Sequence, residues 1–228
     1  MVISKKSVNG RIKLVIFDLD GTLIDAYSAI ARSFNYTMKQ MKYPAQDTLT
    51  IRRKVGWGDR QLLSPFIREE DLAKALLIFR RHHKKAIKIG TRFLPGAGRL
   101  LRTLKKSGMK LAVATNRPSP SAKGIIRYLD LKKFFDYVLC GDKIEKPKPH
   151  PDMLHQILKK FKISHLEAVY VGDMTIDVEA GNRAKVKTVA VATGSSSRKE
   201  IKRFKPYRIV PKLDSVMSIL KNLEGNLF

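Results

Sequence analysis

The chain has 228 residues, 43% of them hydrophobic, which is enough to bury a substantial core. Its formal charge is +26, from 46 Lys and Arg against 20 Asp and Glu, so its surface must be strongly cationic and attractive to anionic partners. The first ten residues lack the apolar segment of a secretory signal, no apolar run reaches membrane-span length, and the single Cys140 has no disulfide partner, so we expect a cytoplasmic protein without membrane contact.

The excess of positive charge is unevenly distributed along the chain. Residues 72–129 contain no acidic residue but 15 Lys and Arg. Such a stretch concentrates anionic substrates and also attracts nucleic acid without sequence preference. Because no pattern of a nucleic-acid-binding module accompanies the charge, a solvated surface is the simpler interpretation. We expect at most weak, nonspecific polyanion binding at low salt.

The first conspicuous element is an apolar run that ends in two aspartates, LVIFDLDGTL at residues 14–23. The run is typical of a buried strand. Because open α/β sheets bind their ligands at the carboxyl ends of strands, Asp18 and Asp20 are candidates for chemistry. An isolated Asp-Gly often only reverses the chain, but two carboxylates at the end of an apolar strand are costly to bury unless a metal ion or hydrogen bonds hold them.

A helical insert follows this strand. From about residue 25 to residue 89 apolar residues recur at spacings of three and four, without the alternation of a strand. Helices are expected at residues 27–41, 49–55 and 71–89, with Asp25 as the N-cap of the first helix. The adjacent His82 and His83 lie among Arg and Lys, and we expect both on a solvated cationic surface.

After residue 92 the pattern changes to alternating strands and helices. The strands are expected at residues 109–116, 137–139, 168–171, 188–192 and 208–210, and the helices at 96–108, 121–129, 151–160, 176–184 and 213–223. Such alternation predicts an α/β fold with a doubly wound parallel sheet, a Rossmann-like core.

Polar side chains follow several of these strands: Thr115, Asn116, Lys146, Lys148, Asp173 and Asp177. If the sheet is parallel, these side chains lie at the same edge as Asp18 and Asp20, and four segments converge on one crevice. The carboxylates suit a divalent cation, and the hydroxyl and ammonium groups suit an anion. Phosphoryl transfer requires this combination.

With these motifs in this order, the sequence resembles the haloacid dehalogenase-like hydrolase superfamily, and within it the phosphoglycolate phosphatase-like branch with a helical cap. The resemblance extends from residue 14 to about residue 223. It rests on DLDGTL at 18–23, FLPGAGRLLRTLKKSGMKLAVATNRP at 93–118, the Lys-Pro-x-Pro segment within KPKPHP at 146–151 and GDMTIDVEAGNRA at 172–184. It implies an α/β core from residues 1–23 and 92–228, with a helical cap at residues 24–91.

The resemblance also implies roles for the catalytic residues. Asp18 would be the nucleophile that takes the phosphoryl group, and Asp20 the acid that protonates the leaving alcohol and then activates water. Thr115, the backbone at Asn116 and a lysine would hold the phosphoryl oxygens. Lys148 fits the family spacing better than Lys146, although the sequence offers both registers.

For the metal, the resemblance implies a magnesium site formed by Asp18, the backbone carbonyl of Asp20 and Asp173. Asp177 would be a further ligand or would support one. An all-oxygen site completed by water and phosphate suits Mg²⁺. The turn VGWGD, which contains Trp57, resembles the turn that such caps extend towards the active site, although a Trp packed between cap helices is nearly as plausible.

The expected function is magnesium-dependent hydrolysis of a small phosphate monoester through an aspartyl phosphate. Phosphoglycolate is the first substrate to consider. The alternatives on the same site are a sugar phosphomutase, a nucleotidase or a pyrophosphatase. A basic nucleic-acid-associated protein is the alternative from a different class, and a complete set of catalytic residues argues against it.

Overall fold

The computed structural model describes residues 11–223, so the parts of the expected core at residues 1–10 and 224–228 lie outside the described residues. The elements are β1 (Leu14–Phe17), β2 (Ile24–Asp25), α1 (Tyr27–Met41), α2 (Thr48–Lys54), α3 (Asp59–Leu63), α4 (Glu69–Gly90), β3 (Arg92–Phe93), α5 (Ala97–Lys106), β4 (Lys110–Thr115), α6 (Ser119–Tyr128), β5 (Tyr137–Cys140), α7 (Asp152–Phe161), β6 (Ala168–Gly172), α8 (Thr175–Arg183), β7 (Lys187–Val191), α9 (Arg198–Arg203), β8 (Arg208–Val210) and α10 (Asp214–Leu223). None of the helices in this part of the chain combines the length and apolarity needed to cross a bilayer.

The main sheet has six strands in the order β5-β4-β1-β6-β7-β8, and every neighbouring pair is parallel. The predicted parallel α/β sheet is therefore confirmed. β1 lies in the middle, where Phe17 is in register with Val113 of β4 and Val171 of β6. Because the chain continues to β4 on one side of β1 and later to β6 on the other, the ends of these three strands frame a crevice.

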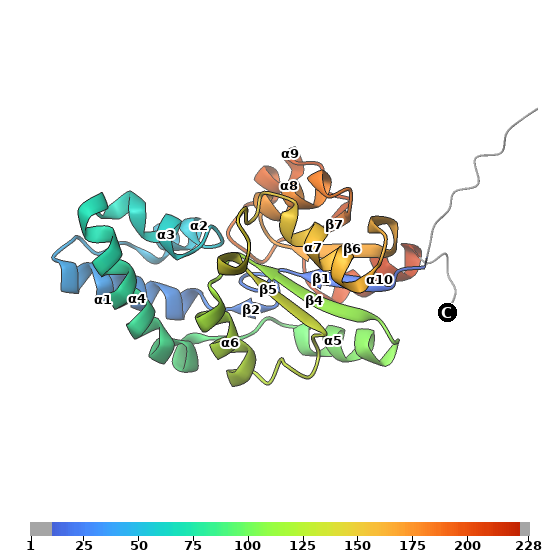
Figure 1. Cartoon of the computed structure of the whole chain (residues 1–228), viewed down its shortest axis with the longest axis horizontal. Helices are drawn as coiled ribbons and strands as arrows, with labels where there is room; N and C mark the ends of the chain where they lie inside the picture. Colours follow the sequence, from blue (N-terminus) through green and yellow to red (C-terminus); the bar gives the residue numbers. More distant parts are fainter. Residues whose placement is uncertain (1–10, 224–228) are drawn as a thin grey trace, which may run out of the picture.

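Helices cover both faces of the sheet (Figure 1). Val15 and Phe17 of β1 join a cluster with apolar residues of α5, α6 and α10. Leu14 and Ile16, which point to the opposite face, join a cluster with residues of α7 and α8. The continuous apolar run of β1 thus reflects burial on both faces, as parallel strands require.

Residues 24–91, which we call the helical insert, contain α1 to α4 and lie beside the sheet, at the left of Figure 1. α1 and α4 pack against each other through apolar stripes that include Ile30 and Phe34 on α1 and Phe79 on α4. β2 and β3 form a short antiparallel ribbon where the chain enters and leaves the insert. The division of the chain into a core and a cap remains a prediction that this arrangement favours.

The structure corrects the prediction for the start of α1. Its N-cap position is Ala26 and not Asp25, because the chain is still extended in β2 at Asp25. Asp25 nevertheless contributes to the helix start, since its Oδ1 accepts a hydrogen bond from the Tyr27 backbone N–H at 3.2 Å. Its Oδ2 atom lies 2.9 Å from Arg92 across the ribbon.

Candidate active site

The site begins where β1 ends. Asp18 and Asp20 follow the strand and are 6% and 8% exposed. The chain then bends at Gly21, whose φ of 79° lies in the left-handed region. A Cβ at this position would overlap Tyr27 and Asp173, so only glycine fits the bend.

The Lys148 ammonium group donates three hydrogen bonds at this strand end. Its Nζ donates to Asp18 Oδ1 at 2.6 Å, to Asp177 Oδ1 at 2.8 Å and to Tyr170 Oη at 2.9 Å, which uses all three N–H groups. Burial opposes its charge, but the carboxylates of Asp177 and Asp18 outweigh burial and raise the pKa of Lys148. Lys146, the other lysine of the segment, is exposed.

The loop after β6 places Asp173 beside Asp18. Asp173 is fully buried, and its Oδ1 accepts from Thr22 Oγ1 at 2.7 Å and its Oδ2 from the Ser195 backbone N–H at 3.2 Å. The backbone of Gly194 passes so close that a Cβ there would overlap the Asp173 carboxylate. Thr22 and the loop after β7 are contributions that the sequence analysis missed.

Asp177 is saturated with hydrogen bonds. Its Oδ1 accepts from Lys148 Nζ at 2.8 Å and Tyr170 Oη at 2.6 Å. Its Oδ2 accepts from the backbone N–H groups of Asp173 at 3.1 Å and Met174 at 2.9 Å. Since a carboxylate has about four acceptor positions, Asp177 has none left for a cation in this arrangement.

The carboxylates of Asp18, Asp173 and Asp177 lie within 4.8 Å of one another. Burial raises the pKa of Asp18 to about 7, with a further contribution from the Asp177 charge. Burial and the Asp177 charge also raise the pKa of Asp173 well above its usual range. Because a cation would relieve this repulsion and the donors are all oxygen, the residues fit Mg²⁺, with Asp18 and Asp173 as the carboxylates that are free to bind it.

Thr115 is the last residue of β4, and Asn116 follows it, next to these groups. Thr115 is 2% exposed, and its Oγ1 accepts a hydrogen bond from the Arg117 backbone N–H at 3.2 Å. The Asn116 side chain accepts from the Lys148 backbone N–H at 3.0 Å and donates to the backbone carbonyls of Lys148 and Gly56 at 2.9 and 3.1 Å. It therefore ties the lysine loop to the helical insert, and its backbone is the part left to bind an anion.

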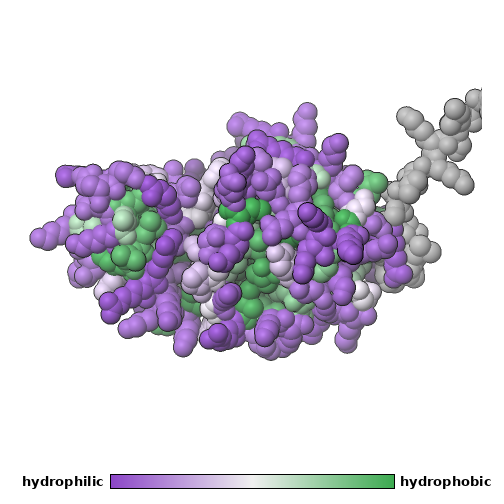
Figure 2. Space-filling model, in the orientation of Figure 1, coloured by the Kyte–Doolittle hydropathy of each residue, from purple (hydrophilic) through white to green (hydrophobic). Residues whose placement is uncertain are grey.

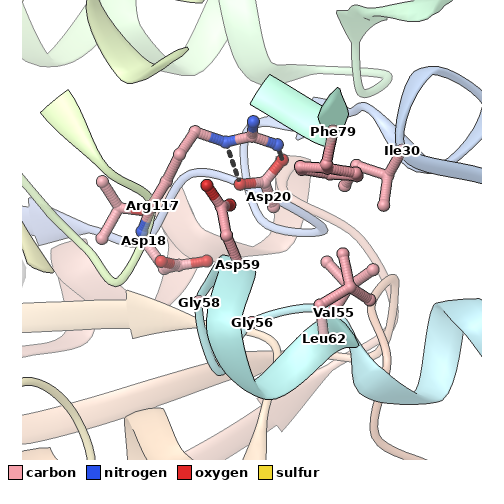
Figure 3. A pocket seen from close by; sticks show the side chains of 11 residues that line it. Asp18, Asp20, Ile30, Val55, Gly56, Gly58, Asp59, Leu62, Phe79 and Arg117 are labelled. Atoms are coloured by element: carbon pink, nitrogen blue, oxygen red, sulfur yellow. Dashed lines mark hydrogen bonds and ion pairs between the residues drawn. The ribbon is translucent and has the colours of Figure 1, made fainter. Parts of the chain in front are cut away.

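Arg117 is the main site residue that the sequence analysis missed. Its Nε and Nη2 donate to the two carboxylate oxygens of Asp20 at 2.8 and 2.6 Å (Figure 3). Both side chains are buried. Its Nη1 donates to His83 Nε2 at 2.7 Å. The sequence did contain a signal for Arg117, because it follows Thr115 and Asn116 directly and so lies at the edge of the sheet where the polar groups converge.

The expectation that His83 lies on a solvated surface is wrong. His83 is 2% exposed, stacks on Phe79 with ring centroids 5.2 Å apart, and lies 3.1 Å from Ser33 Oγ through Nδ1. Burial, assisted by the Arg117 charge, lowers its pKa to about 3. The neighbouring His82 is only half-buried and stacks on Tyr36.

A cavity of about 40 Å³ adjoins these groups, between the strand ends and the insert (Figure 3). Its lining comprises Asp18, Asp20, Thr115 and Arg117 from the strand ends and Ile30, Val55, Gly56, Gly58, Asp59, Leu62 and Phe79 from the insert. The glycines of the VGWGD turn therefore reach the site. Trp57 does not line this cavity; it is 40% exposed and borders a separate groove with Arg52 and Met174.

Comparisons with known proteins show which family the chain belongs to. The family model described as haloacid dehalogenase-like hydrolase matches residues 15–191. A phosphoglycolate phosphatase of Aquifex aeolicus is 31% identical over 80% of this chain and 85% of its own length. A pyrophosphatase of Bacillus cereus is 29% identical over 93% of this chain and 98% of its own length.

Among solved structures, a predicted phosphoglycolate phosphatase from Haemophilus somnus superposes with a TM-score of 0.88 over 92% of this chain and 98% of its own, at 24% identity. A haloacid dehalogenase-like hydrolase from Streptococcus pneumoniae superposes with a TM-score of 0.82 at 26% identity, over 91% of this chain and 98% of its own. The chain therefore belongs to the haloacid dehalogenase-like hydrolase family, in its phosphoglycolate phosphatase-like branch.

Proposed function

We propose that the chain is a magnesium-dependent phosphatase that hydrolyses a small phosphate monoester through an aspartyl phosphate on Asp18. The observation that carries this proposal is the position of Asp18. Its carboxylate stands at the end of the central strand, 2.6 Å from the Lys148 ammonium and beside the buried carboxylate of Asp173. A nucleophile, a fixed cation and a metal-ligating group thus meet at one point.

In the first step, a carboxylate oxygen of Asp18 attacks phosphorus while Lys148, Thr115 and the Asn116 backbone hold the phosphoryl oxygens. Protonated Asp20 gives its proton to the leaving alcohol oxygen. In the second step, Asp20 as a carboxylate takes a proton from the water that cleaves the aspartyl phosphate. The bidentate contact with Arg117 fixes the orientation of the Asp20 side chain for both steps.

Asp18, Asp173 and the backbone carbonyl of Asp20 would hold Mg²⁺, which, when bound, neutralises charge on the phosphoryl oxygens. Asp177, with its four hydrogen bonds, would position Lys148 and the loop that carries Asp173, and would not bind the metal directly.

The helical insert would act as a cap that excludes water from the site. Several contacts fasten it to the strand-end loops, among them those of Arg52 and Asn116. Arg52 Nη2 donates to the carbonyls of Thr193 and Gly194 at 2.9 and 3.0 Å, and Asn116 donates to the Gly56 carbonyl. A closed insert of this kind favours small metabolites over phosphoproteins or long nucleic acids.

Phosphoglycolate is the reference substrate for a first assay, because relatives that bear its name cover most of the chain. Pyrophosphate is the second candidate, since pyrophosphatases match 93% of the chain at 29% identity. A phosphomutase or nucleotidase would use the same Asp18 and Asp20 with a different group in the cavity.

The proposal is tested by hydrolysis of an aryl phosphate with Mg²⁺ or with excess chelator. Activity is expected only with Mg²⁺. Asp18→Asn should abolish turnover, whereas Asp20→Asn should slow both steps and still allow phosphate to be trapped on Asp18. Full activity in chelator would remove the metal assignment. Near wild-type activity of purified Asp18→Asn would remove the nucleophile.

A further inference from the structure

The cavity beyond Asp20 has a composition that bears on the leaving group. Four apolar side chains of the insert line it: Ile30, Val55, Leu62 and Phe79. The insert contributes one charged side chain to this lining, Asp59, at the first turn of α3. Figure 3 shows the Asp59 carboxylate projecting from α3 towards Asp20 and Arg117.

Asp59 keeps an acceptor for a ligand. Its side chain is 12% exposed, and its Oδ2 accepts from Arg80 Nε at 3.0 Å, on the solvent side where Arg80 is 52% exposed. Within residues 11–223, the hydrogen bond of the Asp59 side chain is to Oδ2, and its Oδ1 accepts none. This oxygen of Asp59, on a side chain that lines the cavity, can therefore accept a hydrogen bond from a ligand that displaces water.

No basic side chain at this cavity is free to pair with a second anionic group. Arg117 is the one basic residue in the lining that the structure describes. Its guanidinium already donates to both oxygens of Asp20, to His83 Nε2 and, at 3.4 Å, to Ser121 Oγ. A carboxylate on the leaving group would therefore lack a bidentate partner and would meet the charge of Asp59.

We propose that this cavity selects phosphate esters of small, uncharged alcohols that carry a further hydroxyl group, and that Asp59 discriminates against carboxylate-bearing esters such as phosphoglycolate. The hydroxyl donates to Asp59, and the carbon skeleton packs on the apolar lining. The cavity of about 40 Å³ accommodates a leaving group of only a few heavy atoms, since one water-sized group needs roughly 10–15 Å³. This inference rests on the proposed phosphatase chemistry at Asp18.

The test compares four two-carbon esters that differ only at the end of the leaving group. These are 2-hydroxyethyl phosphate, phosphoglycolate, ethyl phosphate and 2-aminoethyl phosphate. We expect kcat/KM for the hydroxyethyl ester to exceed that for phosphoglycolate by about tenfold or more, because like charges at a desolvated contact are strongly disfavoured. Ethyl phosphate, which cannot donate to Asp59, should fall below the hydroxyethyl ester.

Variants connect the preference to Asp59. Asp59→Asn removes the charge at nearly constant size and should raise the rate for phosphoglycolate relative to the hydroxyethyl ester by about tenfold. Arg80→Gln, which removes the partner of Asp59, should shift the ratio in the opposite direction. Asp71→Asn is the matched control, because Asp71 lies on the same insert, accepts a hydrogen bond from Tyr43 Oη and does not line the cavity. It should leave the ratio of the two rates unchanged.

A preference of the wild type for phosphoglycolate, or an unchanged ratio in Asp59→Asn, would overturn the proposal. So would a faster reaction with the aminoethyl ester, which would assign the cavity to cationic leaving groups. Calorimetric affinities of the four esters for Asp18→Asn with Mg²⁺ give the same ranking without turnover. They decide the inference even if no ester is hydrolysed, a result that would instead contradict the proposed function.

Discussion

Lys148 is the residue on which the geometry of the site depends most. It is 3% exposed and neutralises Asp18 and Asp177 at once. Lys148→Ala would leave two buried carboxylates without their cation, and breaking a buried pair costs about 3–5 kcal/mol of folding free energy. We expect kcat/KM to fall at least about a hundredfold, since the phosphoryl oxygens also lose a fixed charge. Lys146→Ala is the control; because Lys146 is exposed, its rate and melting temperature should match the wild type.

A second expectation concerns Asp18 and pH. The pKa of Asp18 is raised to about 7, so the folded, metal-free chain keeps a proton that an unfolded chain loses near pH 4. Stability should therefore fall as pH rises through about 7, and bound Mg²⁺ should compensate by replacing the proton. The measurement is the melting temperature in chelator and in excess Mg²⁺, between about pH 6.5 and 8.

The gain from Mg²⁺ should be larger at the higher pH. Asp18→Asn is the control, because it removes the titrating carboxyl and should weaken the dependence on pH. A gain from Mg²⁺ that is equal at both pH values would contradict the assignment of Asp18 as a ligand.

At the residue scale, the sequence predicted the side chains that follow the strands and missed those that hydrogen-bond to them, Arg117 and Tyr170. Asp18 was identified because it follows an apolar strand, and Lys148 was chosen over Lys146 because it fits the spacing of the family that the sequence resembles. Arg117 and Tyr170 were missed for a physical reason. An arginine in a basic chain resembles a surface charge, and a tyrosine inside a strand resembles core, until its hydroxyl is seen between Lys148 and Asp177.

At the element scale, α4 shows how such a residue could have been recognised. His83 lies four residues after Phe79 and three before Ala86, on the buried stripe of α4. Its basic neighbours in sequence occupy the other faces of the helix, since adjacent residues are about 100° apart. Periodicity therefore predicts burial of His83 even where local composition predicts exposure.

The buried imidazole of His83 makes the free energy of unfolding of the chain depend on pH. Its pKa is lowered to about 3 from an ordinary value near 6.5, so below pH 6.5 the unfolded chain binds a proton that the folded chain does not. Stability is thus complete above about pH 6.5 and is lost as pH falls, by about 1.4 kcal/mol per unit. The charged and titratable groups that act on the ring are Arg117, Asp20 and His82.

We expect His83→Gln to lose less stability than the wild type between about pH 7 and 5, by about 2 kcal/mol. Urea unfolding at both pH values measures the difference. His82→Gln, at a half-buried position, should retain most of the wild-type dependence. Equal pH dependence of wild type and His83→Gln would show that His83 is not buried as a neutral ring.

Long helices were predicted closely. The helix at residues 27–41 coincides with α1, and the helix predicted at residues 71–89 differs from α4 by two residues at its start and one at its end. β2, β3 and the five-residue α3 were missed, because so few residues show no periodicity and are ordered by tertiary contacts. α9 did have a signal, the capping box formed by Ser197 and Glu200.

At the scale of the whole molecule, the positive charge exceeds what one phosphate ester needs. The acid-free residues 72–129 extend from α4 to α6, and these two helices pack against each other. Some of their cations form ion pairs, such as Arg80 with Asp59 and Lys105 with Asp136. The following are exposed and form no ion pair within residues 11–223: Lys74, Arg81, Lys84, Lys85, Lys88, Arg99, Arg102, Lys106, Lys123 and Arg127.

A protein with this many exposed, unpaired cations should bind duplex DNA or RNA weakly and without sequence preference. Hydrophilic side chains cover much of the face in Figure 2, with hydrophobic patches on the insert and at the centre of the molecule. Because each phosphate contact releases a counterion, affinity should fall steeply with salt and be negligible near about 0.15 M. Fluorescence anisotropy with a labelled duplex, over a series of salt concentrations, measures this dependence.

Reversing the charges of Arg81, Lys84 and Lys85 to Glu should remove most of the binding observed at low salt. The same reversal at Lys159 and Lys160 of α7, which lie outside the acid-free stretch, is the matched control and should have a smaller effect. Since screening acts over about 10 Å at 0.1 M salt, a surface that only steers substrate would lower kcat/KM with added salt and leave kcat nearly unchanged. Sub-micromolar binding that persists at about 0.2 M salt and is lost on the first reversal would contradict this expectation, because electrostatic contacts alone do not survive there. The acid-free stretch would then be a site for nucleic acid in its own right.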